Sequence, residues 1–185
     1  MSVRRPPPAI LVTVSAALAL LAACSRGGAP QVEPDLADTI TVTSSAMAEG
    51  ASIPARFTCV DADVAPPLAW SGVPRDTAEL ALVVDDPDAP GGNYVHWVVF
   101  HLDPGLDGLA EGRLPAGTRQ ARNSAGKAAY AGPCPPSGPA HHYRFSLYAL
   151  GQRLDLPDRA ELDDAVRAID QAATARGRLT ATFAK

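Results

Sequence analysis

Six polar side chains on two proline-rich loops could together bind a charged ligand. One group lies within residues 85–102, which read DDPDAPGGNYVHWVVFHL, and consists of Asp86, Asp88 and His96. The other follows the GPCPPSG segment at residues 132–138 and consists of His141, His142 and Tyr143. A carboxylate favours the protonated form of a nearby imidazole, which then donates charge-assisted hydrogen bonds to an anion. The aspartates could instead cap turns and the histidines be ordinary surface groups, but their gathering at strand ends favours a ligand site.

Motifs of covalent and metal-dependent catalysis are absent from this sequence. It contains no Gly-x-Ser-x-Gly nucleophile elbow and no His-Glu-x-x-His zinc motif. No glycine-rich loop leads from a predicted strand into a helix, so a nucleotide-binding cradle is not expected. Histidine and aspartate are nevertheless suitable metal ligands, which leaves a metal-dependent enzyme as one alternative. We expect a binding protein with no catalytic residues, no cofactor and no bound metal.

The elements that position these side chains are predicted to be mostly strands. In residues 79–84, Leu80, Leu82 and Val84 share one face and Ala81 and Val83 the other. The run that begins at His96 is apolar on both faces, which is typical of a strand covered on both sides. Further strands are predicted at residues 39–43, 53–59, 143–150 and 179–183.

One helix is expected, at residues 159–176. Asp158 and Glu161 stand at capping-box spacing before it, and Gly177 would stop it. Residues 103–130 predict mostly loop with one short strand, and the prolines of residues 132–138 exclude regular structure there. Many strands with one late helix indicate a mainly β fold, a β-sandwich with a helix packed beside it.

Residues 1–23 have the layout of a bacterial signal peptide. Arg4 and Arg5 precede an apolar run shorter than the roughly 20 residues that span a bilayer. The Leu-Ala-Ala-Cys sequence ending at Cys24 resembles the bacterial lipobox, which implies cleavage before Cys24 and lipid attached to it. An ordinary signal peptide with a nearby cysteine is the alternative.

The region after Cys24 predicts a tether and then one domain. Residues 24–38 are rich in Gly, Pro and acidic residues, as flexible linkers are, and the folded domain is expected at residues 39–185. A lipid on Cys24 would hold this domain to a membrane of the cell envelope, facing the periplasm or the exterior.

The charge of the chain argues against a nucleic-acid partner. The formal net charge is −4, and loss of the two arginines of the signal peptide would make it −6. Neutralising phosphates requires clustered Lys and Arg, and the sequence has no basic patch.

The three cysteines are interpreted separately. Cys24 is assigned to lipid, which leaves Cys59 and Cys134. In an exported protein two remaining cysteines favour a disulfide, which would stabilise the fold by about 4 kcal/mol. Two separate buried thiols or two metal ligands are the alternatives, although neither cysteine has a second Cys or a His at close metal spacing.

Several motifs, in this order, resemble the phosphatidylethanolamine-binding protein (PEBP) family, in its bacterial Raf-kinase-inhibitor-like branch. They are Cys59, PPLAW at residues 66–70, DPDAP at 86–90, HW at 96–97, GPCPPSG at 132–138 and HHY at 141–143. The resemblance covers residues 39–183. It implies a β-sandwich of two antiparallel sheets with peripheral helices, here one C-terminal helix.

The family resemblance also implies a pocket for phosphate, acetate or phospholipid head groups. Carried over by motif, its lining would be Asp86, Asp88, His96, His141 and Tyr143, with Pro135 and Pro136 forming a wall. A cis bond between Ala89 and Pro90 is implied as well. In the expected mechanism the aspartates keep His96 and His141 protonated, so that both donate to the anion.

Some positions depart from the family pattern, and they leave a second function open. His142 stands where the family usually has arginine, which would make its contribution depend on pH. Val60, Asp61 and Ala65 also differ from the usual residues of the entrance loop. Members of the family are described as inhibitors, so the surface around the pocket could instead inhibit a protease or another envelope protein.

Overall fold

The computed structural model describes Met1, Leu36 and residues 38–185. The predicted signal peptide after Met1, Cys24 and nearly all of the predicted tether therefore lie outside the described residues. Among the helices that the structure describes, none has the length and apolar character needed to span a bilayer.

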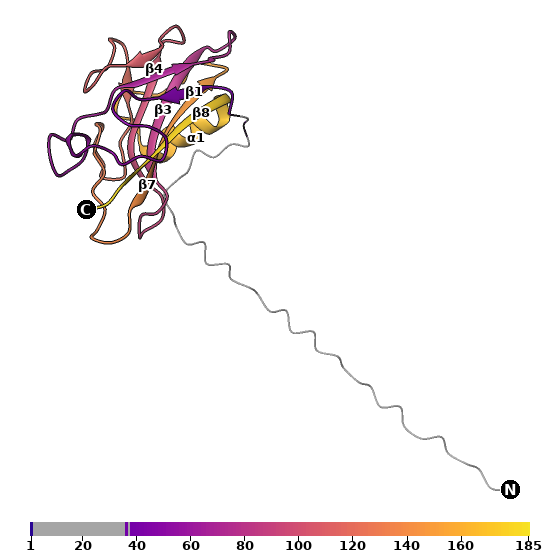
Figure 1. The fold of residues 1–185 in the computed structure, drawn as a ribbon. Helices are drawn as coiled ribbons and strands as arrows, with labels where there is room; N and C mark the ends of the chain where they lie inside the picture. The colour runs from indigo at the N-terminus through magenta and orange to yellow at the C-terminus, as the bar shows by residue number, and fades with distance from the viewer. Residues whose placement is uncertain (2–35, 37) are drawn as a thin grey trace.

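Two antiparallel sheets form the body of the protein, which confirms the predicted β-sandwich (Figure 1). The smaller sheet has the strand order β1-β2-β5, and the larger has the order β6-β4-β3-β7-β8. The strands of the smaller sheet are β1 (Thr41–Thr43), β2 (Leu68–Ser71) and β5 (Gly108–Leu109). The strands of the larger sheet are β3 (Glu79–Asp86), β4 (Tyr94–Leu102), β6 (Arg119–Gln120), β7 (His141–Leu150) and β8 (Ala173–Phe183).

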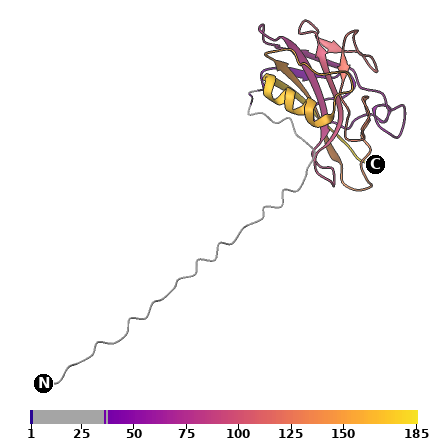
Figure 2. The ribbon, with the colours of Figure 1, turned by 180° about the vertical axis from the view of Figure 1, so that it is seen from behind.

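The alternation of side chains along β3 divides the interior into two cores. Leu80, Leu82 and Val84 belong to the core between the two sheets. Ala81 and Val83 belong to a second core on the other face of the larger sheet, under helix α1 (Leu162–Ala172). Figure 2 shows α1 lying across this face. Because apolar side chains are buried on both faces, each fully buried Val or Leu stabilises the sheet by about 1.5–3 kcal/mol.

The prediction of a strand at residues 53–59 is wrong. A 3-10 helix, η1 (Ala55–Phe57), occupies the segment, and only a single β-bridge, between Ser52 and Thr182, lies beside it. Thr58 closes this turn, because both its backbone N–H and its side-chain hydroxyl donate to the Ala55 carbonyl, at 3.0 and 2.8 Å.

The predicted helix is too long at both ends. Arg159 has φ 61°, and Asp158 accepts a hydrogen bond from Gln120 N rather than capping the helix, so α1 begins only at Leu162. Its last predicted turn belongs to β8, where residues 173–176 pair with β7. Gly177 lies within β8, and an added Cβ there would stand 2.1 Å from the Ile40 carbonyl oxygen. Glycine is thus required for the close approach of the β1 segment, not as a helix stop.

The long loops otherwise follow the predictions. Residues 103–130 contain two very short strands, β5 and β6, where one was expected, and residues 132–138 contain no regular structure. The cis bond implied for Ala89-Pro90 is not found, since every peptide bond in the described residues is trans. The turn closes without it, because Gly92, with φ 104°, donates from its backbone N to the Ala89 carbonyl at 2.9 Å.

Candidate ligand-binding pocket

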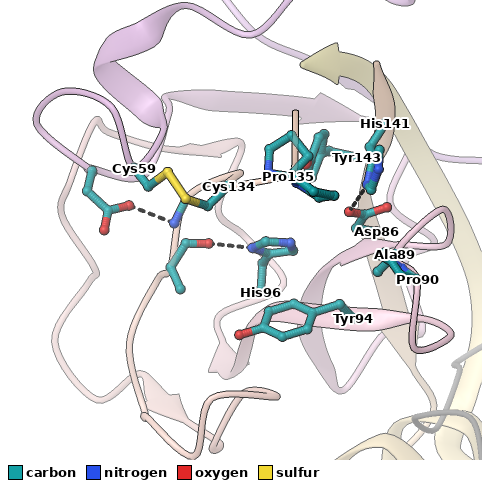
Figure 3. A pocket seen from close by; sticks show the side chains of 14 residues that line it. Cys59, Asp86, Ala89, Pro90, Tyr94, His96, Cys134, Pro135, His141 and Tyr143 are labelled. Carbon is teal, nitrogen blue, oxygen red and sulfur yellow. Dashed lines mark hydrogen bonds and ion pairs between the residues drawn. A yellow bond between two sulfur atoms is a disulfide. The ribbon is translucent and has the colours of Figure 1, made fainter. Parts of the chain in front are cut away.

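A cavity of about 350 Å³ opens at one end of the larger sheet (Figure 3). The antiparallel pairing places the end of β3, the start of β4 and the start of β7 side by side, since Asp86 pairs with Tyr94 and β3 runs beside β7. The lining residues are Cys59, Asp63, Asp86, Ala89, Pro90, Tyr94, His96, Ala131, Gly132, Cys134, Pro135, Pro136, His141 and Tyr143.

A buried ion pair joins two of the predicted site residues. Asp86 Oδ2 lies 2.7 Å from His141 Nδ1, and the two side chains are 5% and 11% exposed. The other carboxylate oxygen, Asp86 Oδ1, accepts from Asp88 N at 2.8 Å. With Nδ1–H directed at Asp86, His141 keeps Nε2 as its second ring nitrogen. A carboxylate in this position fixes the orientation of the imidazole.

His96 differs from the expectation that the aspartates keep it protonated. Burial lowers its pKa, and the hydrogen bond to Ala131 together with the charge of Asp86 offsets this only in part. Its Nδ1 lies 2.7 Å from the Ala131 carbonyl oxygen, so Nδ1 carries the proton and Nε2 carries the lone pair. The opposite edge of the ring faces the cavity in Figure 3. Neutral His96 therefore offers an acceptor to a ligand, not a second donor.

The loop that holds the Ala131 carbonyl is organised by Asn123, which the sequence did not reveal as important. Its side-chain amide donates to the carbonyls of His96 and Ala129 at 3.2 and 3.0 Å. Its Oδ1 accepts from the backbone of Ala125 and Lys127, both at 3.0 Å. One buried amide thus adds four hydrogen bonds to the backbone bonds of this loop, among them Asn123 N to Lys127 O and Ala131 N to His96 O.

Tyr143 is a lining residue whose hydroxyl is buried near Asp86. The side chain is fully buried, and no described residue forms a hydrogen bond with its Oη. Burial, followed by the negative charge of Asp86, raises its pKa, so the hydroxyl stays protonated over the physiological range. Its ring also packs edge-on against His96, with the ring centroids 5.3 Å apart. The hydroxyl is a donor that a bound ligand could satisfy.

Asp88 and His142 form a second pair outside the cavity. Asp88 was expected among the lining residues, but its carboxylate instead accepts from both N and Nδ1 of His142, at 2.9 and 2.7 Å. Both side chains are exposed. The hydrogen bonds from His142 lower the pKa of Asp88. Because Cβ atoms alternate along a strand, His142 points away from the face that carries His141 and Tyr143.

Several lining residues were missed by the sequence analysis. Tyr94 could have been found, because it stands two positions before His96 on the same strand face, and their rings lie 4.8 Å apart. Asp63 carried no signal, since only the tertiary fold brings its Oδ1 within 2.6 Å of Gly132 N. Pro135 and Pro136 line the cavity as the resemblance implied.

The predicted disulfide is present in the structure, and both of its cysteines line the cavity. Cys59 and Cys134 are bonded across 75 residues of sequence. In Figure 3 the bridge stands across the pocket from the His141–Asp86 pair. Among the described residues, no group of three or more His, Cys, Asp or Glu side chains could hold a metal ion.

Comparison with known sequences identifies related proteins. A sequence profile of the family described as phosphatidylethanolamine-binding protein matches residues 43–184. The Mycobacterium tuberculosis protein named "Putative lipoprotein LppC" is 51% identical over 156 residues, which cover 84% of this chain and 75% of that protein. A Methanothermobacter thermautotrophicus protein of the UPF0098 group is 47% identical over 123 residues, covering 64% of this chain and 81% of its own length.

Solved structures show the same fold. The crystal structure of a Chlamydia trachomatis PEBP homologue superposes with a TM-score of 0.74 at 34% identity and covers 80% of this chain and 99% of its own. The structure of Escherichia coli YbcL, described as a new member of the mammalian PEBP family, has a TM-score of 0.75 at 28% identity, with the same coverage.

Proposed function

Because this chain belongs to the phosphatidylethanolamine-binding protein family, we propose that it is an envelope-tethered protein that binds small phosphate-bearing anions, such as phospholipid head groups, in the pocket of Asp86, His96, His141 and Tyr143. The observation that carries the proposal is the unpartnered hydroxyl of Tyr143 beside the His141–Asp86 pair. A buried polar group without a partner costs about 1–3 kcal/mol, and a ligand that accepts its proton would recover that cost.

The ring nitrogens define which ligand groups fit. Protonated His141 donates from Nε2, and Tyr143 donates from Oη, so both are suited to the anionic oxygens of a phosphate. His96 Nε2 accepts, and it therefore requires an O–H or N–H of the ligand. A singly protonated phosphate, or a phosphate ester with an ammonium group, supplies both kinds of partner. Asp86 compensates the charge of His141 and does not face the anion unpaired.

The experiment is calorimetric titration of the full chain in non-ionic detergent with inorganic phosphate and with phosphoethanolamine at pH 5.5 and 7.5. We expect binding to weaken at pH 7.5, because an imidazole whose Nδ1–H faces a carboxylate can donate from Nε2 only while the ring is protonated. His141→Ala and Asp86→Asn should abolish the heat of binding. The matched controls are His142→Ala and Asp88→Asn, which change the exposed pair and should leave the affinity unaltered.

Two results would contradict the proposal. The first is an affinity for phosphate that stays constant from pH 5.5 to 7.5, since the protonation of His141 would then play no part. The second is equal loss of binding in the control pair and in the buried pair. Absence of heat for every sample would favour the alternative of a protein inhibitor that acts through the surface around the pocket.

We also propose that the ligand is bound and not converted. The two cysteines are joined in a disulfide and Tyr143 holds its proton, so neither a thiolate nor a phenolate is present among the lining residues. The ³¹P NMR spectrum of phosphoethanolamine should therefore remain unchanged during prolonged incubation with the protein. Release of inorganic phosphate that depends on protein concentration would contradict this.

The tether is the remaining part of the proposal. The relative from M. tuberculosis is named as a lipoprotein, and the Leu-Ala-Ala-Cys sequence of this chain supports lipid on Cys24 and a folded domain that begins near residue 39. We expect the expressed full chain to incorporate labelled fatty acid and to partition into detergent. Cys24→Ser should abolish the label, whereas retention of label would place the lipid elsewhere.

A further inference from the structure

We propose that the Cys59–Cys134 disulfide is a thiol–disulfide exchange site that regulates the pocket: a dithiol that reduces it releases the wall formed by residues 134–139 and weakens ligand binding. This inference rests on the proposed function for its ligand readout. It follows from the position of the bridge, from its exposure, and from the way the Pro-rich wall is held.

The bridge is part of the pocket itself. Cys59 follows η1, Cys134 precedes Pro135 and Pro136, and all four residues line the cavity. Cys134 is exposed and Cys59 is half-buried, so a reductant in solution can reach the sulfur atoms. Structural disulfides are commonly buried and inert, whereas accessible ones exchange with thiols.

Few other interactions hold the wall. Residue 133 accepts a hydrogen bond from Cys59 N at 3.1 Å, and Gly132 N donates to Asp63. Beyond that point, residues 134–139 form no backbone hydrogen bond with any residue that the structure describes. Three of the six are prolines, which have no N–H to donate. The covalent bridge and the burial of Pro135 therefore fix this segment against the cavity.

A cation lies beside the exposed sulfur. Lys185 Nζ is 3.9 Å from Cys134 Sγ, and this residue follows strand β8, whose Phe183 pairs with His141 at the pocket end of the sheet. An ammonium in this position attracts an incoming thiolate and stabilises negative charge that develops on the Cys134 sulfur.

The exchange reaction is balanced with a dithiol as reductant. One thiolate of the reductant attacks Cys134 Sγ, the Sγ–Sγ bond breaks, and Cys59 leaves as a thiolate that takes up a proton. The second thiolate of the reductant then attacks the mixed disulfide and releases Cys134 as a thiolate beside Lys185. The two cysteines have gained two electrons, and the reductant has become a disulfide.

The test uses the full chain with Cys24→Ser in non-ionic detergent, so that Cys59 and Cys134 are the only cysteines. Dithiothreitol is added without denaturant, free thiols are counted, and circular dichroism confirms that the fold remains. Two readouts follow: the affinity for inorganic phosphate, and the hydrogen exchange of the Cys59 and Gly132 amides, which bond to residue 133 and to Asp63.

We expect the reduced protein to stay folded, to bind phosphate about tenfold more weakly because the closed wall is less populated, and to exchange both amides faster. Reoxidation should restore both properties. Cys59→Ser/Cys134→Ser should have the phosphate affinity and amide exchange of the reduced protein, and dithiothreitol should change neither. Lys185→Gln should slow reduction several-fold, whereas Lys185→Arg should retain the rate.

A bridge that cannot be reduced until the protein unfolds would overturn the inference, and so would a reduced protein with unaltered affinity and amide exchange. An unchanged reduction rate in Lys185→Gln would overturn the role of the lysine. If the oxidised protein binds no phosphate, the proposed function fails, and the amide exchange still decides whether reduction releases the wall.

Discussion

Two histidine–aspartate pairs of the same 2.7 Å length lie at neighbouring positions and have opposite surroundings. His141 and Asp86 are buried at the cavity, while His142 and Asp88 are exposed beside it. The exposed pair is expected to contribute little stability, since solvent screens it. A consecutive pair of histidines in the sequence thus divides into one candidate ligand residue and one surface residue, because successive strand residues face opposite ways.

Removal of one hydroxyl should separate binding from stability. Tyr143→Phe should weaken phosphate binding about tenfold or more, since a hydrogen bond to a charged group contributes about 1.5–3 kcal/mol. Its free energy of unfolding without ligand should stay constant or rise, because the lost hydroxyl has no partner among the described residues.

Tyr130→Phe is the matched control for this prediction. The Tyr130 hydroxyl donates to the Phe57 carbonyl at 2.7 Å and lies outside the cavity lining. Its loss should lower the free energy of unfolding by about 1 kcal/mol and leave phosphate affinity intact. Denaturant unfolding and calorimetry of both variants measure the two quantities; a stability loss in Tyr143→Phe as large as that of the control would show that its hydroxyl is already bonded.

The buried His96 predicts how stability depends on pH. Because burial lowers its pKa in the folded protein, the unfolded chain binds the proton more readily than the folded protein does. The stability that neutral His96 contributes is therefore fully present above the pKa of an unfolded histidine, about 6.5. This contribution is lost as the pH falls below that value towards the lower pKa of His96 in the folded protein. We expect the melting temperature without ligand to fall between pH 7.5 and pH 5, and His96→Gln to show a smaller fall. An equal pH dependence in both proteins would assign the effect to other groups.

At the scale of elements, β8 is one of the two edge strands of the larger sheet, and the segments around β1 protect that edge. Thr39 and Ile40 both donate to the Arg176 carbonyl, at 2.9 and 3.1 Å, and Gly50 donates to Thr180 at 2.8 Å. An uncovered edge of this length would offer unpaired groups to other chains. Residues 173–176, which are helical by local pattern, are extended because they pair with β7 on the other side.

A substitution of Gly177 tests the close contact between β8 and the segment that precedes β1. Gly177→Ala would place a Cβ 2.1 Å from the Ile40 carbonyl oxygen, so the β1 segment would have to move. We expect a loss of about 2 kcal/mol or more in the free energy of unfolding, as for overpacking of a close contact. Gly91→Ala is the control, since no atom lies within 4 Å of its added Cβ, and it should change stability by less than about 0.5 kcal/mol. Denaturant unfolding compares the two, and similar losses would contradict the contact.

At the scale of the whole molecule, one covalent bond connects distant parts of the sequence at the pocket. The disulfide closes a loop of 75 residues that contains β2 to β6, which are the smaller sheet's second and third strands and three strands of the larger sheet. Constraint of the unfolded chain by a loop of this size stabilises the fold by about 4 kcal/mol.

The contribution of the bridge can be measured directly. Cys59→Ser/Cys134→Ser should lower the free energy of unfolding by about 4 kcal/mol. The variant should still fold, because neither cysteine belongs to either hydrophobic core. Guanidinium unfolding of the variant and of the parent gives the difference. A variant that does not fold at all would show that the bridge is required for the fold as a whole.

The sequence alone determined which residues face which way and which family the chain resembles. The two-residue period of β3 and β7 predicted the interior faces, and the ordered motifs predicted the two-sheet fold, because both signals are local. The family comparisons and the structure confirm these points. Of the residues expected at the site, all but Asp88 line the cavity, while the other lining residues were not singled out for the site.

Only the tertiary structure decided the features that depend on distant partners. Residues 173–176 became strand because β7 offered them hydrogen bonds, and Asp63 reached the pocket through a contact with Gly132. His96 is neutral because burial lowers its pKa by more than the nearby carboxylates raise it. The carboxylate of Asp88 lies outside the cavity, where it accepts a hydrogen bond from His142. Burial and pairing across the fold set these outcomes, and neither can be read from neighbouring residues in the chain.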